Sequence, residues 1–203
     1  VDNLHMKDRI LLEDVPSGQE YLSGIIEAMK QGNLVNITYQ SYWRKNSNTF
    51  DVEPYCVKLF KQRWYLIARS PYYDKVMTYA LDRILDLEVL ADEKFSMPDT
   101  FIPSEFFEEY YGVVFDDDLA VEKIKLKVSA DQANYLRSLP LHHSQQENQT
   151  TDKYSIFELE LCPTYDFYQE ILRNGEEIEV LEPLWLRKEI AGEIEKMWNK
   201  YKS

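Results

Sequence analysis

The spacing of apolar and polar positions predicts a helix near the start of the chain. Between residues 19 and 30, apolar side chains recur at three- and four-residue intervals, as on one face of an amphipathic helix. We expect Ser17 to cap this helix and Gly32-Asn33 to end it. Residues 1–17 show no clean period, so they are expected to form an extended arm.

Five short segments with strand-like patterns follow this helix. Turns separate them roughly every 8–12 residues, a pattern typical of a small β-barrel. Closure into a barrel would leave no exposed sheet edge, although Pro54 implies an edge or a bend in the second strand. The expected strands are Leu34–Tyr42, Thr49–Phe60, Arg63–Arg69, Val76–Leu81 and Arg83–Leu90.

Residues 93–118 interrupt the alternating pattern and are expected to form a connector. The segment holds Pro98 and Pro103, and a short helix is expected to begin near Pro103-Ser104. Its acidic and aromatic composition differs from that of the predicted strands on either side. We therefore expect separate domains over 18–92 and 119–203.

The last part of the chain has the order β-α-β-β-α-β followed by a closing helix. That order predicts a ferredoxin-like α/β domain with an extra helix, and an α+β class for the chain as a whole. We expect Gly175 to end the second helix. The expected elements are Val121–Val128, Ser129–Leu139, His142–Thr150, Tyr154–Leu161, Pro163–Asn174, Glu177–Leu181 and Pro183–Tyr201.

Charge is distributed unevenly along the chain. The net charge is −13, which argues against coating of DNA by phosphate neutralisation. Residues 34–85, however, hold eight basic and four acidic side chains, so this segment is +4 and the remainder is −17. A local basic region attracts an anionic ligand, although Lys and Arg also occur on strand surfaces simply to keep sheet edges solvated.

The third predicted strand offers both a core face and a candidate binding face. Because side chains alternate along a strand, Trp64, Leu66 and Ala68 are expected to face the core. The opposite face then carries Arg63, Tyr65, Ile67 and Arg69. Guanidinium groups match phosphate oxygens in a bidentate manner, and tyrosine rings can stack on bases. Packing of Tyr65 and ordinary surface exposure of the two arginines are the alternative interpretations.

Further candidate ligand-binding residues come from the neighbouring segments. Arg83 could supply a third guanidinium, or could simply pair with the adjacent Asp82 or with an acidic loop. Arg44 lies in a predicted turn, where it would at least raise the local potential. Hydroxyl groups and rings could come from Ser41, Tyr55 and Tyr79.

Nothing in the chain favours catalysis, a metal or a cofactor. No glycine-rich phosphate loop or Ser-His-Asp or Cys-His arrangement is present, and none of the three histidines lies in the predicted barrel. Cys56 and Cys162 are expected to be buried, unpaired residues of a protein in the reducing cytoplasm. No stretch reaches the ~20 apolar residues needed to cross a bilayer. We therefore expect no enzyme activity, no cofactor and no membrane contact.

Five short motifs, in order, carry a resemblance to one family. Trp64-Tyr65-Leu66 resembles the signature of the WYL domain. The other motifs are Ile37-Thr38-Tyr39, Glu53-Pro54-Tyr55, Leu81-Asp82-Arg83-Ile84, and Gly175 with Glu179-Val180-Leu181-Glu182-Pro183. The last of these resembles the C-terminal extension, or WCX, domain that often follows WYL. The resemblance implies a Sm-like or SH3-like five-stranded barrel over 18–92 and a WCX domain over 119–203.

The resemblance also implies a function. It suggests the ligand-sensing and oligomerisation portion of a bacterial transcriptional regulator, expected to be a homodimer. Its ligand would be single-stranded nucleic acid or a nucleotide, and double-stranded DNA would be bound only by a helix-turn-helix that is not seen before residue 18. The sequence departs from the family at Ala80, at or near a position where a second arginine is often found. The alternative is an SH3-like module that docks an acidic protein partner.

Overall fold

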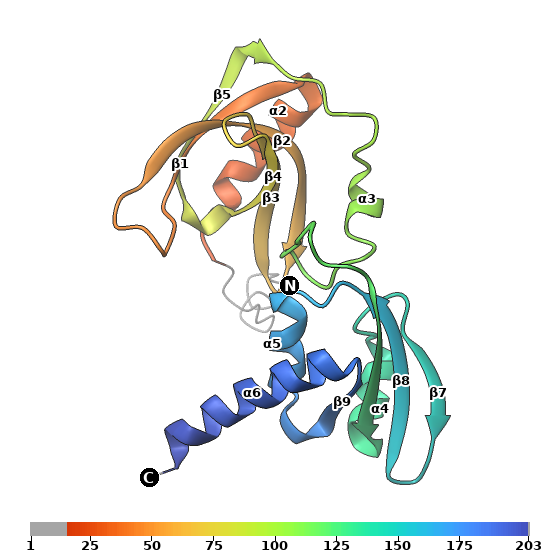
Figure 1. The fold of residues 1–203 in the computed structure, drawn as a ribbon. Coiled ribbons are helices and arrows are strands. Elements are labelled where there is room, and N and C mark those ends of the chain that lie inside the picture. Colours follow the sequence, from red (N-terminus) through yellow and green to blue (C-terminus); the bar gives the residue numbers. More distant parts are fainter. Residues whose placement is uncertain (1–15, 203) are drawn as a thin grey trace, which may run out of the picture. The chain divides into compact units, whose positions relative to one another are not determined.

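The computed structural model describes residues 16–202, which form two compact units (Figure 1). The first unit extends to Asp99 and the second begins at Thr100. The extended arm expected over residues 1–17 lies almost entirely outside the described residues. No helix in the described part of the chain is both long and apolar enough to cross a bilayer.

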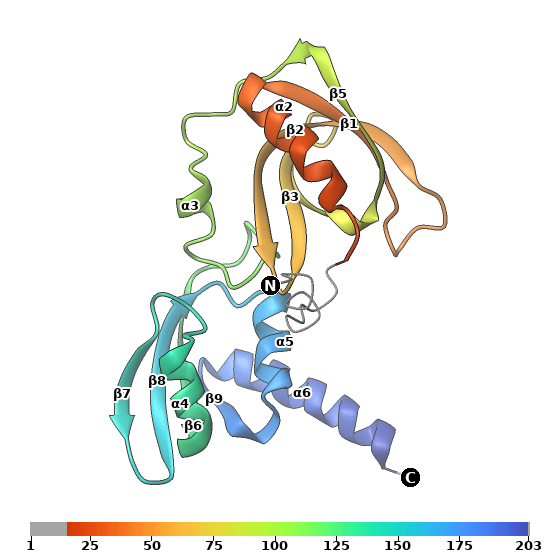
Figure 2. The ribbon, with the colours of Figure 1, turned by 180° about the vertical axis from the view of Figure 1, so that it is seen from behind.

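The first unit begins with the predicted amphipathic helix. A short turn, η1 (Gln19–Tyr21), leads into α2 (Leu22–Gln31), which buries Ile25 and Ala28 against the sheet (Figure 2). The helix ends at Gly32, whose left-handed φ of 66° lets its N–H reach the carbonyls of the last turn. The Ser17 cap is wrong, because the residue preceding η1 is Gly18 and no side chain caps either helix.

A five-stranded antiparallel sheet makes up the rest of the first unit. Its spatial order is β4-β3-β2-β1-β5, and the buried core under α2 includes Val35, Ile37 and Leu66. Figure 2 shows α2 against this sheet. The strands are β1 (Asn33–Tyr39), β2 (Asn48–Phe60), β3 (Arg63–Ser70), β4 (Lys75–Ala80) and β5 (Ile84–Lys94).

Closure of this sheet into a barrel is not confirmed. Among the described residues β4 and β5 are the two outer strands, and no ladder of hydrogen bonds joins them. The physical reason lies between them, where Leu81–Arg83 forms a 3₁₀ turn, η2, instead of continuing a strand. β5 then starts with Ile84 paired to Tyr39 of β1, which leaves the outer edge of β4 without a partner strand.

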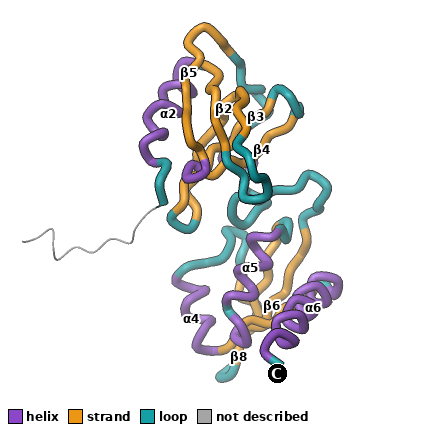
Figure 3. The backbone as a smooth tube through the Cα atoms, turned by 90° about the vertical axis from the view of Figure 1, so that its left-hand side faces the viewer, coloured by secondary structure: helices purple, strands orange, loops and turns teal. Residues whose placement is uncertain are grey.

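The second unit has the connectivity and strand order of a ferredoxin-like fold. Its antiparallel sheet has the order β7-β8-β6-β9, and the helices that follow β6 and β8 cover one face of it (Figure 3). The opposite face carries Lys123, Lys125 and Lys127 of β6, which pair with glutamates of β8 and β9. The elements are α3 (Pro103–Phe106), β6 (Glu122–Ser129), α4 (Ala130–Ser138), β7 (Gln146–Thr150), β8 (Tyr154–Leu161), α5 (Tyr165–Arg173), η3 (Gly175–Glu177), β9 (Ile178–Glu182) and α6 (Leu184–Tyr201).

The segment expected to be a connector is tied to the second unit by hydrogen bonds. Asp166 of α5 accepts the N–H groups of Val113 and Val114 at 2.8 and 2.9 Å. Gly112 has a φ of 91°, and a Cβ there would lie 2.4 Å from the Asp166 carboxylate. Only glycine therefore lets the chain make this approach. The short helix expected near Pro103 is confirmed as α3.

The two cysteines are both free thiols. Cys162 is buried, and Cys56 is half-buried. Burial raises the pKa of Cys56 to about 11, so this thiol stays protonated and unreactive at neutral pH.

One ion pair of the second unit predicts a defined pH dependence of stability. Arg137 of α4 donates to the Glu147 carboxylate of β7 at 2.6 and 2.9 Å. The hydrogen bonds from Arg137, followed by that from the Thr150 hydroxyl, lower the pKa of Glu147 from 4.5 to about 2. Because the folded-state pKa lies below the unfolded one, the stabilisation is fully present above about pH 5 and is lost as the pH falls toward about 2.

We therefore expect a Glu147→Gln variant to be less stable than the parent at neutral pH and to lose less stability on acidification. Urea denaturation at several pH values between about 6 and 2.5 measures both effects. An identical decline of the free energy of unfolding in the two proteins would contradict the assignment.

Candidate ligand pocket

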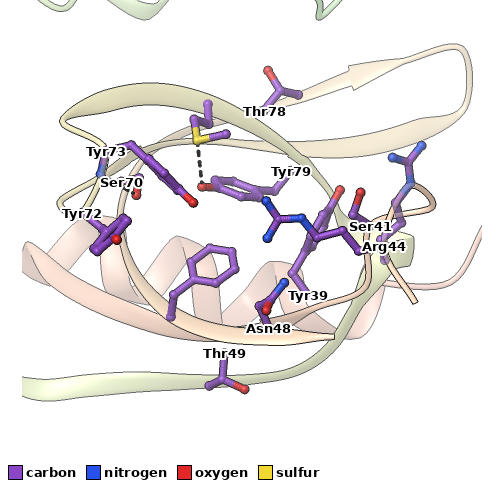
Figure 4. Close-up of a pocket in the computed structure, with 13 residues that line it drawn as sticks. Tyr39, Ser41, Arg44, Asn48, Thr49, Ser70, Tyr72, Tyr73, Thr78 and Tyr79 are labelled. Atoms are coloured by element: carbon purple, nitrogen blue, oxygen red, sulfur yellow. Dashed lines mark hydrogen bonds between the residues drawn. The ribbon is translucent and has the colours of Figure 1, made fainter. Parts of the chain in front are cut away.

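A pocket of about 590 Å³ opens in the first unit beside the ends of β1, β2, β3 and β4 (Figure 4). This volume falls within the range of small-molecule sites. The lining contains two arginines and five aromatic residues, and none of its described residues is an Asp or Glu. The lining residues are Tyr39, Ser41, Arg44, Asn48, Thr49, Phe50, Ser70, Tyr72, Tyr73, Met77, Thr78, Tyr79 and Arg83.

Three packed aromatic rings connect the pocket to the core of the unit. The rings of Tyr39 and Tyr79 meet edge to face at 5.4 Å, and the Phe50 ring lies 5.7 Å from that of Tyr79. Tyr79 occupies this place because it pairs with Leu66 across the sheet and so shares its core-facing side. Burial raises the pKa of Tyr79 to about 12, and its neutral hydroxyl donates to the Met77 sulfur at 3.5 Å (Figure 4).

Arg83 reaches the pocket because of the 3₁₀ turn that precedes β5. Its neighbour Asp82 instead pairs with Arg63, at 3.3 Å between Nε and Oδ2. The Arg83 guanidinium carbon lies 4.1 Å from the centre of the Tyr42 ring, in a cation–π contact. Within the described part of the chain no carboxylate pairs with Arg83, and its buried Nε has no hydrogen-bond partner. The alternative that Arg83 pairs with Asp82 is therefore wrong.

Arg44 stands on a loop whose backbone is held by one side chain. The Gln40 amide donates to the carbonyls of Ser41 and Arg44 at 3.0 and 2.7 Å. The Arg44 N–H also donates to the Ser41 carbonyl at 3.2 Å. The loop thus fixes the base of an exposed arginine that, across residues 16–202, forms no ion pair.

Tyr72 and Tyr73, on the turn between β3 and β4, form the end of the pocket opposite Ser41 and Arg44 (Figure 4). Their rings meet edge to face at 4.8 Å, and both are largely exposed to solvent. The Tyr73 N–H donates to the buried Ser70 hydroxyl at 3.4 Å, which anchors the turn. Exposed aromatic rings at a pocket mouth offer stacking surfaces to a planar ligand.

The structure brings together four of the eight residues singled out in the sequence. Ser41, Arg44, Tyr79 and Arg83 line the pocket. Sequence reasoning missed the aromatic residues Tyr39, Phe50, Tyr72 and Tyr73. The consecutive tyrosines after Pro71 were the available signal, because two large rings in a polar turn have no core to enter.

The other four candidates do not line this pocket. Arg69 donates to Glu53 at 2.8 Å and also pairs with Asp74, so its charge is neutralised. Arg63 pairs with Asp82, as described above. Tyr65 shares the face of β3 that carries these arginines, opposite the core-facing Leu66. Ligand contact by these residues stays a prediction from the sequence.

Tyr55 is buried away from the pocket. Its hydroxyl donates to Glu53 at 3.3 Å, and its ring stacks on Phe95 at 6.0 Å. Burial, followed by the nearby Glu53 carboxylate, raises its pKa. These contacts give Tyr55 a packing role in the structure.

The arrangement is suited to binding an anionic, planar compound. Two guanidinium groups that pair with no carboxylate of the described residues can donate to phosphate oxygens, while hydroxyls and rings surround them. Among the residues described, no group of three or more His, Cys, Asp or Glu side chains is placed to hold a metal ion. The fold and the pocket together define a two-unit α+β protein whose first unit carries a cationic, aromatic pocket.

Comparison with protein families identifies both units. A WYL domain model matches residues 20–89, and a WCX domain model matches residues 120–198. The chain therefore belongs to the family of proteins in which a WYL domain is followed by a WCX domain. No curated protein matches the chain.

Two solved structures are similar to the chain. Proteasome accessory factor B/C (PafBC) of Arthrobacter aurescens matches at 18% identity and a TM-score of 0.42, over 89% of this chain and 28% of that one. A CRISPR Cas-related protein matches at 12% identity and a TM-score of 0.53, over 89% of this chain and 51% of that one. The chain thus spans about a quarter and about half of these two proteins, and the second likeness shows a common fold.

Proposed function

We propose that this chain is the ligand-sensing portion of a bacterial transcriptional regulator and acts in the cytoplasm by binding rather than by catalysis. Its ligand is a phosphate-bearing compound, either a nucleotide or single-stranded nucleic acid. Ligand occupancy would control a helix-turn-helix segment that reads double-stranded DNA. The membership in the WYL and WCX family supports the regulatory context.

The single observation that carries the proposal is the charge of the pocket. Arg44 and Arg83 line it, and neither pairs with a carboxylate among residues 16–202, in a chain whose net charge is −13. Elsewhere in the described residues the arginines of the same basic segment, Arg63 and Arg69, are paired with acidic groups. The pocket is thus a local attractive site for anions on an otherwise repulsive protein.

The aromatic end of the pocket supports a ligand that also carries a base. Tyr72 and Tyr73 are exposed at the end opposite Arg44 (Figure 4). Stacking of a base on an aromatic side chain contributes about 1–3 kcal/mol. A nucleotide unit has a planar base and a charged phosphate separated by a sugar, which suits these two ends. Simple inorganic anions would use only the arginines.

Binding of a labelled oligothymidylate to the whole chain, measured at several salt concentrations, tests the proposal. Each phosphate contact on a single strand contributes about −0.7 to the slope of log association constant against log salt concentration. Two contacts therefore predict a slope of about −1.4. Adenosine monophosphate is expected to compete for the same site. Failure of both compounds to bind at low salt would contradict the proposal, and binding of a glutamate-rich peptide instead would favour an acidic protein partner.

A further inference from the structure

The C-terminal helix α6 buries its apolar stripe over only half of its length. In the first half, Leu186 and Ile190 pack into the core of the second unit. Figures 1 and 2 show the later turns extending beyond the sheet of this unit. The same stripe continues there on Ile194, Met197, Trp198 and Tyr201, which are 51%, 48%, 61% and 82% exposed.

These four side chains form one continuous face. Their spacing of i, i+3, i+4 and i+7 places them on the side of the helix that buries Ile190 one turn earlier. Single exposed apolar residues are ordinary, but a contiguous stripe with a tryptophan and a tyrosine at its centre and end marks an interaction surface. Aromatic residues and methionine are enriched at such surfaces.

The charged residues that flank this stripe are ordered along the helix. At 100° per residue, Glu193 and Lys200 lie on one flank of α6 and Glu195 lies on the other. Lys202, the residue that directly follows the helix, continues this second flank. On both flanks the acidic residue comes first and the basic residue follows seven positions later. The middle of each charged pair falls close to Met197 and Trp198.

The direction of pairing with a second copy follows from this order. In a parallel pair of helices, Glu193 of one copy would face Glu195 of the other, and the lysines would likewise face each other. In an antiparallel pair, each flank faces the same flank of the partner helix, and the two flanks run in opposite directions. Glu193 then lies near Lys200 of the second copy, and Glu195 lies near Lys202. Opposite charges attract across such a seam, and like charges oppose it.

We propose that the exposed half of α6 pairs antiparallel with the same helix of a second copy of this chain, about a two-fold axis near Met197 and Trp198. Each contact then occurs twice, as in any self-complementary two-fold interface. The stripe spans about 10 Å along the helix at 1.5 Å per residue, so a reversible dimer is expected. This surface lies on the second unit, and the inference does not depend on the ligand of the pocket.

Sedimentation velocity over a range of concentrations tests whether the surface forms a dimer. The parent chain is expected to shift from monomer to dimer as its concentration rises, whereas Trp198→Glu is expected to stay monomeric at the same concentrations. Tyr135→Glu is the matched control, because Tyr135 is 68% exposed on α4 of the same unit. A monomeric parent chain, or a dimer that survives Trp198→Glu, would overturn the proposal.

Charge reversal tests the antiparallel direction. A variant with Glu193→Lys and Glu195→Lys places lysines opposite lysines and is expected to dimerise at least tenfold more weakly. Addition of Lys200→Glu and Lys202→Glu restores opposite charges across the seam and is expected to restore dimerisation. Both variants lose the Glu193–Lys196 ion pair within the helix, so that loss cannot explain the rescue. Absence of rescue would overturn the antiparallel arrangement.

Discussion

Replacement of Arg83 by glutamine is expected to weaken binding of a single-stranded oligonucleotide roughly ten- to a hundredfold. A charge-assisted hydrogen bond contributes about 1.5–3 kcal/mol, and 1.4 kcal/mol corresponds to a factor of ten in affinity. The Arg83 guanidinium has no carboxylate partner among the described residues, so its full charge is available to a phosphate. Its contact with the Tyr42 ring also holds it in place. Fluorescence anisotropy at a fixed low salt concentration measures the effect.

Arg69→Gln is the matched control for this prediction. Arg69 comes from the same basic segment, but it is neutralised by Glu53 and Asp74 and does not line the pocket. We expect its affinity for the oligonucleotide to stay within about twofold of the parent. The slope of the salt dependence is expected to fall by about 0.7 in Arg83→Gln, which is the contribution of one phosphate contact on a single strand, and to stay unchanged in Arg69→Gln. The reverse pattern would place the ligand on the other face of β3.

Replacement of Phe167 by alanine is expected to destabilise the second unit by about 3–5 kcal/mol. Phe167 is a residue of α5 and is fully buried in the core of the second unit. The centre of its ring lies 6.2 Å from the centre of the Tyr111 ring. Since a domain is typically stable by only about 5–15 kcal/mol, this loss is a large share of the total. Hydrogen exchange measured by mass spectrometry should show β6 and β8 exchanging about a hundredfold faster or more.

Tyr165→Ala serves as the control on the same helix. Tyr165 is the first residue of α5 and is 64% exposed. Its replacement is expected to change stability by no more than about 0.5 kcal/mol. Equal effects of the two substitutions on exchange in β6 and β8 would show that the core of this unit is not organised around Phe167.

The regular elements of the chain followed closely from its sequence pattern. The pattern alternates along Tyr154–Leu161, and apolar residues recur every three or four positions over residues 19–30. Both patterns depend only on which side of the element is buried, and the strand and the helix are both confirmed. Ser129, the first residue of the helix expected over Ser129–Leu139, caps α4, because its hydroxyl accepts the Gln132 N–H at 3.3 Å. The cap at Ser17 failed, since Gly18 and η1 begin the helix differently.

The candidate site was only half predictable. Sequence alternation correctly placed Arg63, Tyr65 and Arg69 on one face of a strand, but it could not show which carboxylates lie opposite. Glu53 reaches Arg69 from a neighbouring strand 16 positions earlier in the chain. The pocket itself uses the other side of the sheet, where Tyr79 and Arg83 meet the two loops that hold Arg44 and Tyr72.

By itself, the sequence determined the α+β class, the family motifs and the concentration of positive charge in residues 34–85, because these depend on local pattern and composition. Only the tertiary structure decided which arginines keep an available charge, that the first sheet stays open between β4 and β5, and that α6 leaves half of its apolar stripe exposed. Each of these depends on the distance between groups far apart in the chain. Local spacing constrains which face a residue occupies, but only the fold brings an opposing charge or a covering side chain to that face.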